Sequence, residues 1–129
     1  MKVNELMVGD WVNMGNPVTD ELVPTKIENI YGDEINCKTG HTSDDVPTIL
    51  SGKWLRYARP IHLTEEVLMK NGFEKFAESE TLFDYTDNDI HLEYWIGDGC
   101  FRYYTAEIHY VHQLQHLLRL VGVQNEIEL

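Results

Sequence analysis

The chain contains 129 residues, 43% of them hydrophobic, and carries a formal net charge of −12 from 22 acidic and 10 basic side chains. This length and composition support a buried core and exclude an intrinsically disordered chain. The sequence has no apolar run of the roughly 18 residues that cross a membrane, and its first residues lack the apolar segment of a signal peptide. We therefore expect a cytoplasmic protein. Its negative charge disfavours direct binding to nucleic acid or to an anionic membrane.

The charge is unevenly distributed along the chain. Residues 1 to 60 contain 6 Lys or Arg and 9 Asp or Glu, whereas residues 61 to 129 contain 4 and 13. Pro60 lies where the composition changes and can interrupt an element. We predict two domains, residues 1–59 and residues 60–129, with most of the acidity in the second.

Short strands separated by glycine turns characterise the first domain. Gly9-Asp10 interrupts the chain before a strand at 11–14, and Gly32-Asp33 separates strands at 23–31 and 34–38, where apolar and polar residues alternate. One or two further strands are expected at 49–57. Four or five such strands in about 60 residues favour a closed sheet without exposed edges, so we predict a small SH3-like β-barrel.

The second domain begins with a helix signal. Thr64 can act as N-cap, with Glu65 and Glu66 in the first turn, and Gly72 is expected to end the helix. Strands are predicted at 73–76, 82–85, 90–96 and 100–108, with 97–99 as a hairpin turn. Residues 126–129 suit either a short edge strand or a frayed end. We classify this domain as an α+β lobe of the α-β-β-β-α type with an antiparallel sheet.

Residues 110–122 form the most strongly patterned segment, an amphipathic helix that ends at Gly122. Its apolar face carries Val111, Leu114, Leu117, Leu118 and Val121, and its polar side carries His112, Gln113, Gln115, His116 and Arg119. We expect the leucine stripe to cover the sheet of the second domain.

Three histidines near this helix are the candidate metal ligands: His109, His112 and His116. The residue after His112 is glutamine, so the general base of an HExxH hydrolase motif is missing. The spacing also suits solvent or interface residues, and we predict neither a metal nor a cofactor. Oxygen ligands recur at 84, 87 and 89, but the glycine and final glutamate of a calcium loop are absent.

Cysteine chemistry is the other catalytic candidate. Cys100 can act as a nucleophile only if the fold brings it to His109 or His91, and no local motif indicates this. We interpret Cys100 as a buried strand residue, and Cys37 and Cys100 as reduced thiols rather than a disulfide.

A basic, aromatic segment at 53–59 is the candidate binding surface of the first domain. Its side chains suit an acidic peptide or a single nucleic-acid strand, but the overall negative charge favours a barrel strand whose aromatic residues face inward. The residues concerned are Lys53, Trp54, Arg56 and Tyr57.

Three stretches together resemble a family of small uncharacterised proteins found in gut anaerobes, their prophages and mobile elements. These are LMVGDWV at 6–12, the segment 60–73 with its LTEE and NGF elements, and YVHQLQ at 110–115. The resemblance spans nearly the whole chain. It implies a host-modulating setting and no catalytic residues.

The sequence favours a non-catalytic protein-binding or modulatory module over an enzyme. Its partner is expected to be another protein, contacted through Lys53, Trp54, Arg56 and Tyr57 or through a helix face with His112, Gln113 and His116. Two alternatives remain open: a small metal-dependent or cysteine enzyme, and an acidic mimic of nucleic acid. Oligomeric state is left undetermined.

Overall fold

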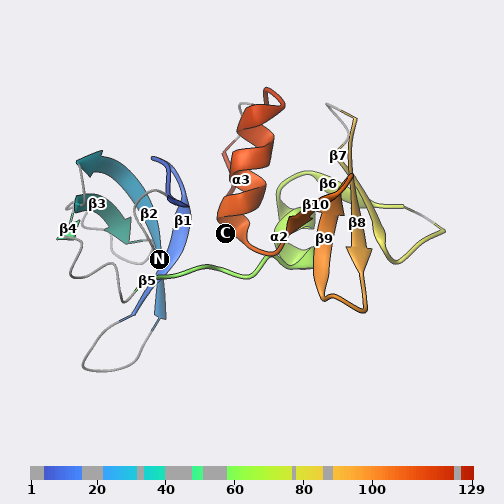
Figure 1. Ribbon diagram of the computed structural model, residues 1–129, viewed down its shortest axis with the longest axis horizontal. Helices are drawn as coiled ribbons and strands as arrows, with labels where there is room; N and C mark the ends of the chain where they lie inside the picture. Colours follow the sequence, from blue (N-terminus) through green and yellow to red (C-terminus); the bar gives the residue numbers. More distant parts are fainter. Residues whose placement is uncertain are drawn as a thin grey trace. The chain divides into compact units, whose positions relative to one another are not determined.

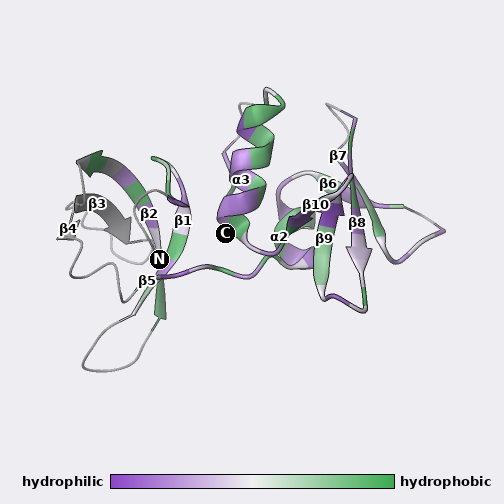
Figure 2. Cartoon of the chain, viewed as in Figure 1, coloured by the Kyte–Doolittle hydropathy of each residue, from purple (hydrophilic) through white to green (hydrophobic). Residues whose placement is uncertain are grey.

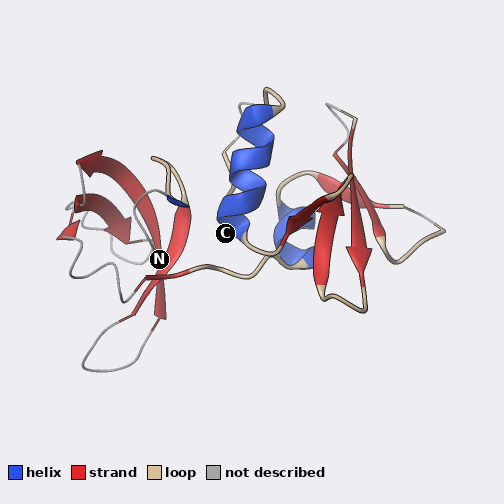
Figure 3. Cartoon of the chain, in the orientation of Figure 1, coloured by secondary structure: helices blue, strands red, loops and turns tan. Residues whose placement is uncertain are grey.

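The computed structural model describes residues 5–15, 22–31, 34–39, 48–50, 58–76, 78–85, 89–123 and 126–129, with the backbone alone at 29, 31, 34–39 and 48–50. The chain divides into two compact units, Met1–Ile61 and His62–Leu129. The fold is α+β: each unit contains an antiparallel sheet, and the two named α-helices belong to the second unit (Figures 1 and 3).

The N-terminal unit contains five described strands: β1 (Trp11–Gly15), β2 (Leu22–Tyr31), β3 (Glu34–Thr39), β4 (Thr48–Leu50) and β5 (Ala58–Arg59). Their order in the sheet is β4-β3-β2-β1-β5, and all neighbours are antiparallel. The strands predicted at 11–14, 23–31 and 34–38 are confirmed. Among the described strands, no pairing joins β4 to β5, so the sheet has two ends where an SH3-like barrel was expected.

The turn that leads into β1 is held by a buried carboxylate. Asp10 accepts a hydrogen bond at Oδ2 from the Met7 N–H at 2.8 Å, and its backbone oxygen accepts from the Ile27 N–H at 2.9 Å. Gly9 adopts φ +90°, which favours glycine over residues with a Cβ. The turn thereby positions β1 to pair with β2, and a small core of Leu6, Val12 and Ile27 packs beside them.

The C-terminal unit has a helix at each end of a five-stranded meander. Its elements are α2 (Glu65–Lys70), β6 (Phe73–Lys75), β7 (Leu82–Tyr85), β8 (Ile90–Trp95), β9 (Cys100–Tyr103), β10 (Ala106–Ile108) and α3 (Val111–Leu120). The sheet order β10-β9-β8-β7-β6 follows the chain. The described sheet therefore has five strands, where the sequence predicted the three or four of an α-β-β-β-α lobe. One reason is Tyr104, whose φ of +54° makes a turn within the strand predicted at 100–108.

The predicted caps of α2 are confirmed. Thr64 Oγ1 accepts a hydrogen bond from the Val67 N–H at 3.3 Å, and Glu65 and Glu66 occupy the first turn, where the helix dipole favours negative charge. Gly72 follows the helix at φ +94°.

Helix α3 largely follows its predicted amphipathic pattern, visible as alternating hydropathy in Figure 2. Val111, Leu114, Leu117 and Leu118 are buried, and Gly122 follows the helix at φ +87°. Two assignments were wrong. Val121 is 36% exposed, and the expected polar side includes the buried residues His112 and Gln115.

The C-terminal residues form neither an edge strand nor a frayed end. Asn71 donates from Nδ2 to the Glu128 backbone oxygen at 2.7 Å and accepts at Oδ1 from the Glu128 N–H at 2.7 Å. Ile127 is buried beside them. The Asn71 amide thus pairs with both polar groups of the Glu128 backbone, as a neighbouring strand would.

The C-terminal sheet has one covered and one open face. Along β8, Ile90 and Leu92 are buried while the alternate residues His91 and Glu93 are exposed. The covered face joins the helices in a core of Leu68, Phe73, Phe83, Ile90, Leu92, Phe101, Ile108, Val111, Leu114 and Leu118. We call the opposite side the outer face. Cross-strand pairing places Glu74, Leu82, Asp84, His91, Glu93, Trp95, Cys100, Arg102 and Glu107 on it.

Candidate functional site

The pairing of β9 with β10 brings three metal-ligating side chains together on the outer face. Arg102 lies opposite Glu107, and Phe101 lies opposite Ile108. One antiparallel step further, this register sets Cys100 against His109. Among the described residues, Cys100, Glu107 and His109 are the one set of three possible ligands whose donor atoms all lie within 4.8 Å of one another.

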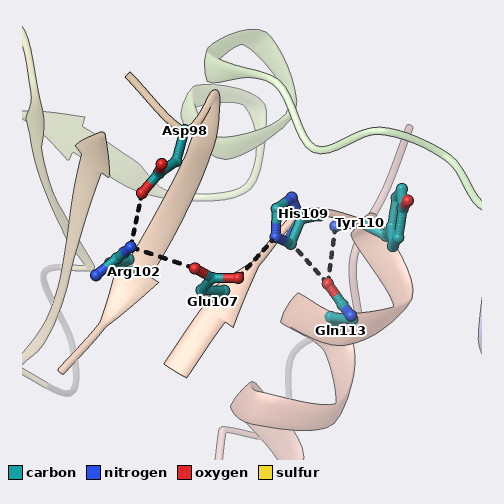
Figure 4. Close-up of polar contacts among 6 residues, drawn as sticks. All are labelled: Asp98, Arg102, Glu107, His109, Tyr110 and Gln113. Carbon is teal, nitrogen blue, oxygen red and sulfur yellow. Dashed lines mark hydrogen bonds and ion pairs between the residues drawn. The ribbon is translucent and has the colours of Figure 1, made fainter. Parts of the chain in front are cut away.

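A chain of polar contacts runs through this cluster (Figure 4). Arg102 Nη2 donates to Asp98 Oδ2 at 2.7 Å and to Glu107 Oε1 at 3.2 Å. The second oxygen of the same carboxylate, Glu107 Oε2, lies 3.2 Å from His109 Nε2. The Glu107 carboxylate therefore contacts the Arg102 guanidinium with one oxygen and the His109 imidazole with the other.

Arg102 is fixed from several sides. Its guanidinium lies 4.0 Å from the centroid of the Trp95 ring, a cation–π contact. Desolvation lowers the pKa of Arg102, but hydrogen bonds with Cys100 and Asp98 and the charges of Asp98 and Glu107 raise it by more, so the net shift is upward. Arg102 is thus a permanent positive charge beside the cluster.

The backbone at His109 is held on both sides. Its N–H donates to Gln113 Oε1 at 2.8 Å, and its carbonyl accepts from the Leu63 N–H at 2.9 Å. Gln113 Oε1 also accepts from the Tyr110 N–H at 3.1 Å, which satisfies a donor at the start of α3. His109 therefore sits on a short, fixed link between the sheet and the helix (Figure 4).

Exposure differs sharply within the cluster. Cys100 is 1% exposed, whereas the side chains of His109 and Glu107 are 36% and 50% exposed. The thiol is too shielded to attack a substrate directly, while the imidazole and the carboxylate can be reached from solvent. This arrangement suits ligation of an ion better than nucleophilic catalysis.

Among the described residues, His109, His112 and His116 do not form a ligand set with one another. His112 is buried with its ring stacked on Tyr110, and its centroid lies 5.7 Å from that of His116 in an edge-to-face contact. His91 forms an ion pair with Asp84 on the outer face. Of the histidines considered from the sequence, His109 is the one that joins Cys100.

The remaining predicted residues give no site in the described part of the chain. Gln113 uses its side-chain oxygen at the start of α3. The candidate residues of the basic segment lie outside the described residues, as does residue 87 of the acidic turn; they are Lys53, Trp54, Arg56 and Tyr57. Cys100 is confirmed as a buried strand residue with a free thiol.

Glu107 is the ligand candidate that sequence reasoning missed. It lies two residues before His109, so both point to the same face of an extended segment. The sequence therefore predicts that Glu107 and His109 share a face. It does not predict that Cys100 lies beside them, because this requires the turn at Tyr104.

Two shallow grooves include side chains of the outer face, and the smaller one includes Arg102 beside the cluster. The larger, of about 660 Å³, is lined by Lys75, Phe76, Tyr85 and His91 and by the carboxylates of Glu74, Glu78, Asp84 and Asp89. The smaller, of about 230 Å³, shares His91 and adds Leu82, Leu92, Glu93, Arg102, Tyr103 and Tyr104. Both grooves therefore contain carboxylates and aromatic rings.

No family model, curated protein or solved structure matches this chain. In the part of the chain that the structure describes, none of the helices is long and apolar enough to span a membrane.

Proposed function

We propose that this protein is a non-catalytic protein-binding module and that the outer face of its C-terminal sheet binds a basic segment of another protein. The observation that carries the proposal is the combination of carboxylates and exposed aromatic rings along two grooves that share His91. Of the residues that line these grooves, Glu74, Asp84, His91 and Glu93 belong to the outer face, opposite the side where the helices of this unit pack.

The chemistry of this face defines the partner. Glu74, Asp84 and Asp89 supply negative charge to one groove, and a protein with net charge −12 attracts cationic partners from a distance. Tyr104 is 85% exposed and Trp95 is 44% exposed, and such rings are common anchors at the centre of interfaces. A segment with Lys or Arg beside apolar residues satisfies both groups.

Several sequence-based expectations belong to the same proposal. The N-terminal unit is an SH3-like sheet that stays open between the described strands β4 and β5, the protein acts in the cytoplasm, and its setting is a prophage or mobile element. Contacts through Lys53, Trp54, Arg56 and Tyr57 or through His112, Gln113 and His116 are further predicted surfaces.

The four carboxylates of the larger groove favour one second candidate, mimicry of nucleic acid. In that case the partner is itself a nucleic-acid-binding protein, and its own nucleic acid competes for the same surface. Competition with a short DNA duplex distinguishes the two candidates. The duplex displaces this protein from a partner that binds nucleic acid through the same surface, and it leaves in place a partner that does not bind nucleic acid.

The test is capture from a lysate of a gut anaerobe with matched variants. Tyr104→Asn removes a ring while keeping a residue that tolerates positive φ, and Glu93→Gln removes a charge from the smaller groove. Leu120→Asn is the control, because Leu120 is as exposed as Tyr104 but lies on α3. We expect a basic protein retained by the wild type and the control and lost by Tyr104→Asn/Glu93→Gln. Identical capture by all three proteins would refute the proposal.

A further inference from the structure

We propose that Cys100, Glu107 and His109 form a binding site for a divalent transition-metal ion, most suitably zinc. Thiolate sulfur, imidazole nitrogen and carboxylate oxygen are the three donor types that zinc takes from proteins. The thiolate excludes calcium and magnesium, which take oxygen ligands. This inference uses side chains on the outer face but does not depend on the proposed protein partner.

The spacing of the donor atoms fits one ion after a small adjustment. Ligands placed about 2.0–2.3 Å from a tetrahedral zinc ion lie about 3.4–3.6 Å apart. The three donor atoms lie within 4.8 Å of one another, and Glu107 Oε2 and His109 Nε2 are 3.2 Å apart. Side-chain displacements on the order of 1 Å therefore bring the donor atoms to the separations that a zinc ion requires.

The surroundings orient two of the ligands in advance. Arg102 holds Glu107 through Oε1 and leaves Oε2 facing the imidazole. The backbone of His109 is fixed by Gln113 on one side and Leu63 on the other. Outer contacts of this kind set ligand direction in metal sites.

Charge also favours an ion at this position. Binding releases the thiol proton of Cys100 to solvent, which leaves a thiolate next to the Glu107 carboxylate. Arg102 compensates only part of this negative charge, because its one positive charge is shared between Asp98 and Glu107. A divalent cation supplies the remainder.

Three protein ligands leave a fourth position on zinc. Because Glu107 and His109 are half-exposed while Cys100 is buried, that position faces solvent. An open position is typical of zinc sites that bind water or an external ligand, in contrast to closed four-ligand structural sites.

The test uses the full-length protein without an affinity tag, with Cys37→Ser as the common background so that one thiol remains. Metal is removed with a chelator, and the protein is titrated with Co²⁺ and, in competition with a chromophoric chelator, with Zn²⁺. The ligand variants are Cys100→Ser, Glu107→Gln and His109→Gln. His91→Gln is the matched control, since His91 is an exposed histidine on the same sheet face that pairs with Asp84.

We expect one equivalent of metal and a thiolate-to-cobalt charge-transfer band that Cys100→Ser abolishes. Loss of a residue that hydrogen-bonds a metal ligand typically weakens metal affinity roughly 10- to 100-fold. Glu107→Gln and His109→Gln remove ligands themselves, so each should weaken zinc binding by at least this factor. His91→Gln should leave zinc binding unchanged. If Cys100→Ser fails to fold, two measurements still test the proposal. They are the charge-transfer band in the background protein and the zinc affinities of Glu107→Gln and His109→Gln, whose side chains are partly exposed. The proposal would be overturned by any of three results. These are less than one equivalent of bound metal, no charge-transfer band with cobalt, or equal zinc affinity in His109→Gln and the background protein.

Discussion

Replacing Gln113 should destabilise the C-terminal unit through the junction between β10 and α3. Gln113 Oε1 accepts from two backbone N–H groups, those of His109 at 2.8 Å and Tyr110 at 3.1 Å. Gln113→Ala removes both hydrogen bonds. A net hydrogen bond contributes about 0.5–1.5 kcal/mol, and loss of a helix N-terminal cap costs about 0.5–2 kcal/mol, so we expect a loss of about 1–2 kcal/mol in the free energy of unfolding.

The matched variant is Gln113→Glu. It keeps an acceptor oxygen at the same position and adds negative charge in the first turn of α3, where the helix dipole favours it. We therefore expect Gln113→Glu to retain the stability of the wild type while Gln113→Ala loses it.

Urea unfolding measures this difference, with hydrogen exchange of peptides from 100–123 assigning the transition to the C-terminal unit. The alanine variant should show a lower midpoint with an unchanged slope. Equal midpoints for Gln113→Ala and the wild type, or equal destabilisation by alanine and glutamate, would refute the role given to this oxygen.

Three further outcomes follow from the C-terminal unit. Gly72→Ala should cost about 1–2 kcal/mol in thermal unfolding, because Gly72 has φ +94° and an added Cβ would lie 3.1 Å from the Tyr85 ring; an unchanged melting temperature would contradict this. Asn71→Ala should speed hydrogen exchange at 126–129, since Asn71 holds the Glu128 backbone with two hydrogen bonds, and unaltered exchange would show that the tail is held otherwise. Zinc at 100 times its dissociation constant should add about 2.7 kcal/mol to the stability of the wild type by calorimetry, and an equal gain in His109→Gln would place the ion elsewhere.

Local signals explain what the sequence predicted well. The cap at Thr64 and the glycines after both helices act within one turn of the chain, so they mark helix ends directly. Alternating strand residues such as those of β8 likewise follow from the period of two and a core on one side.

Non-local packing explains what the sequence did not provide. Tyr104 has no residue-type signal for its positive φ, so the turn that creates β10 was missed. Without that turn, nothing in the sequence places His109 beside Cys100, nine residues earlier. The burial of His112 depends on neighbours such as Tyr110, whose ring stacks on it. The contact between Cys100 and His109 thus depends on the pairing of β9 with β10, whose register the local pattern leaves open.

The most direct measurement of the proposed binding face is photo-crosslinking in cells. A benzoyl-phenylalanine residue is placed at position 104 on the outer face or, as a control, at position 120 on α3, because Tyr104 and Leu120 are each 85% exposed. The proposed function predicts an adduct from position 104 alone, joined to a lysine- or arginine-rich segment of one protein. An adduct from position 120 alone, or equal adducts from both positions, would contradict it.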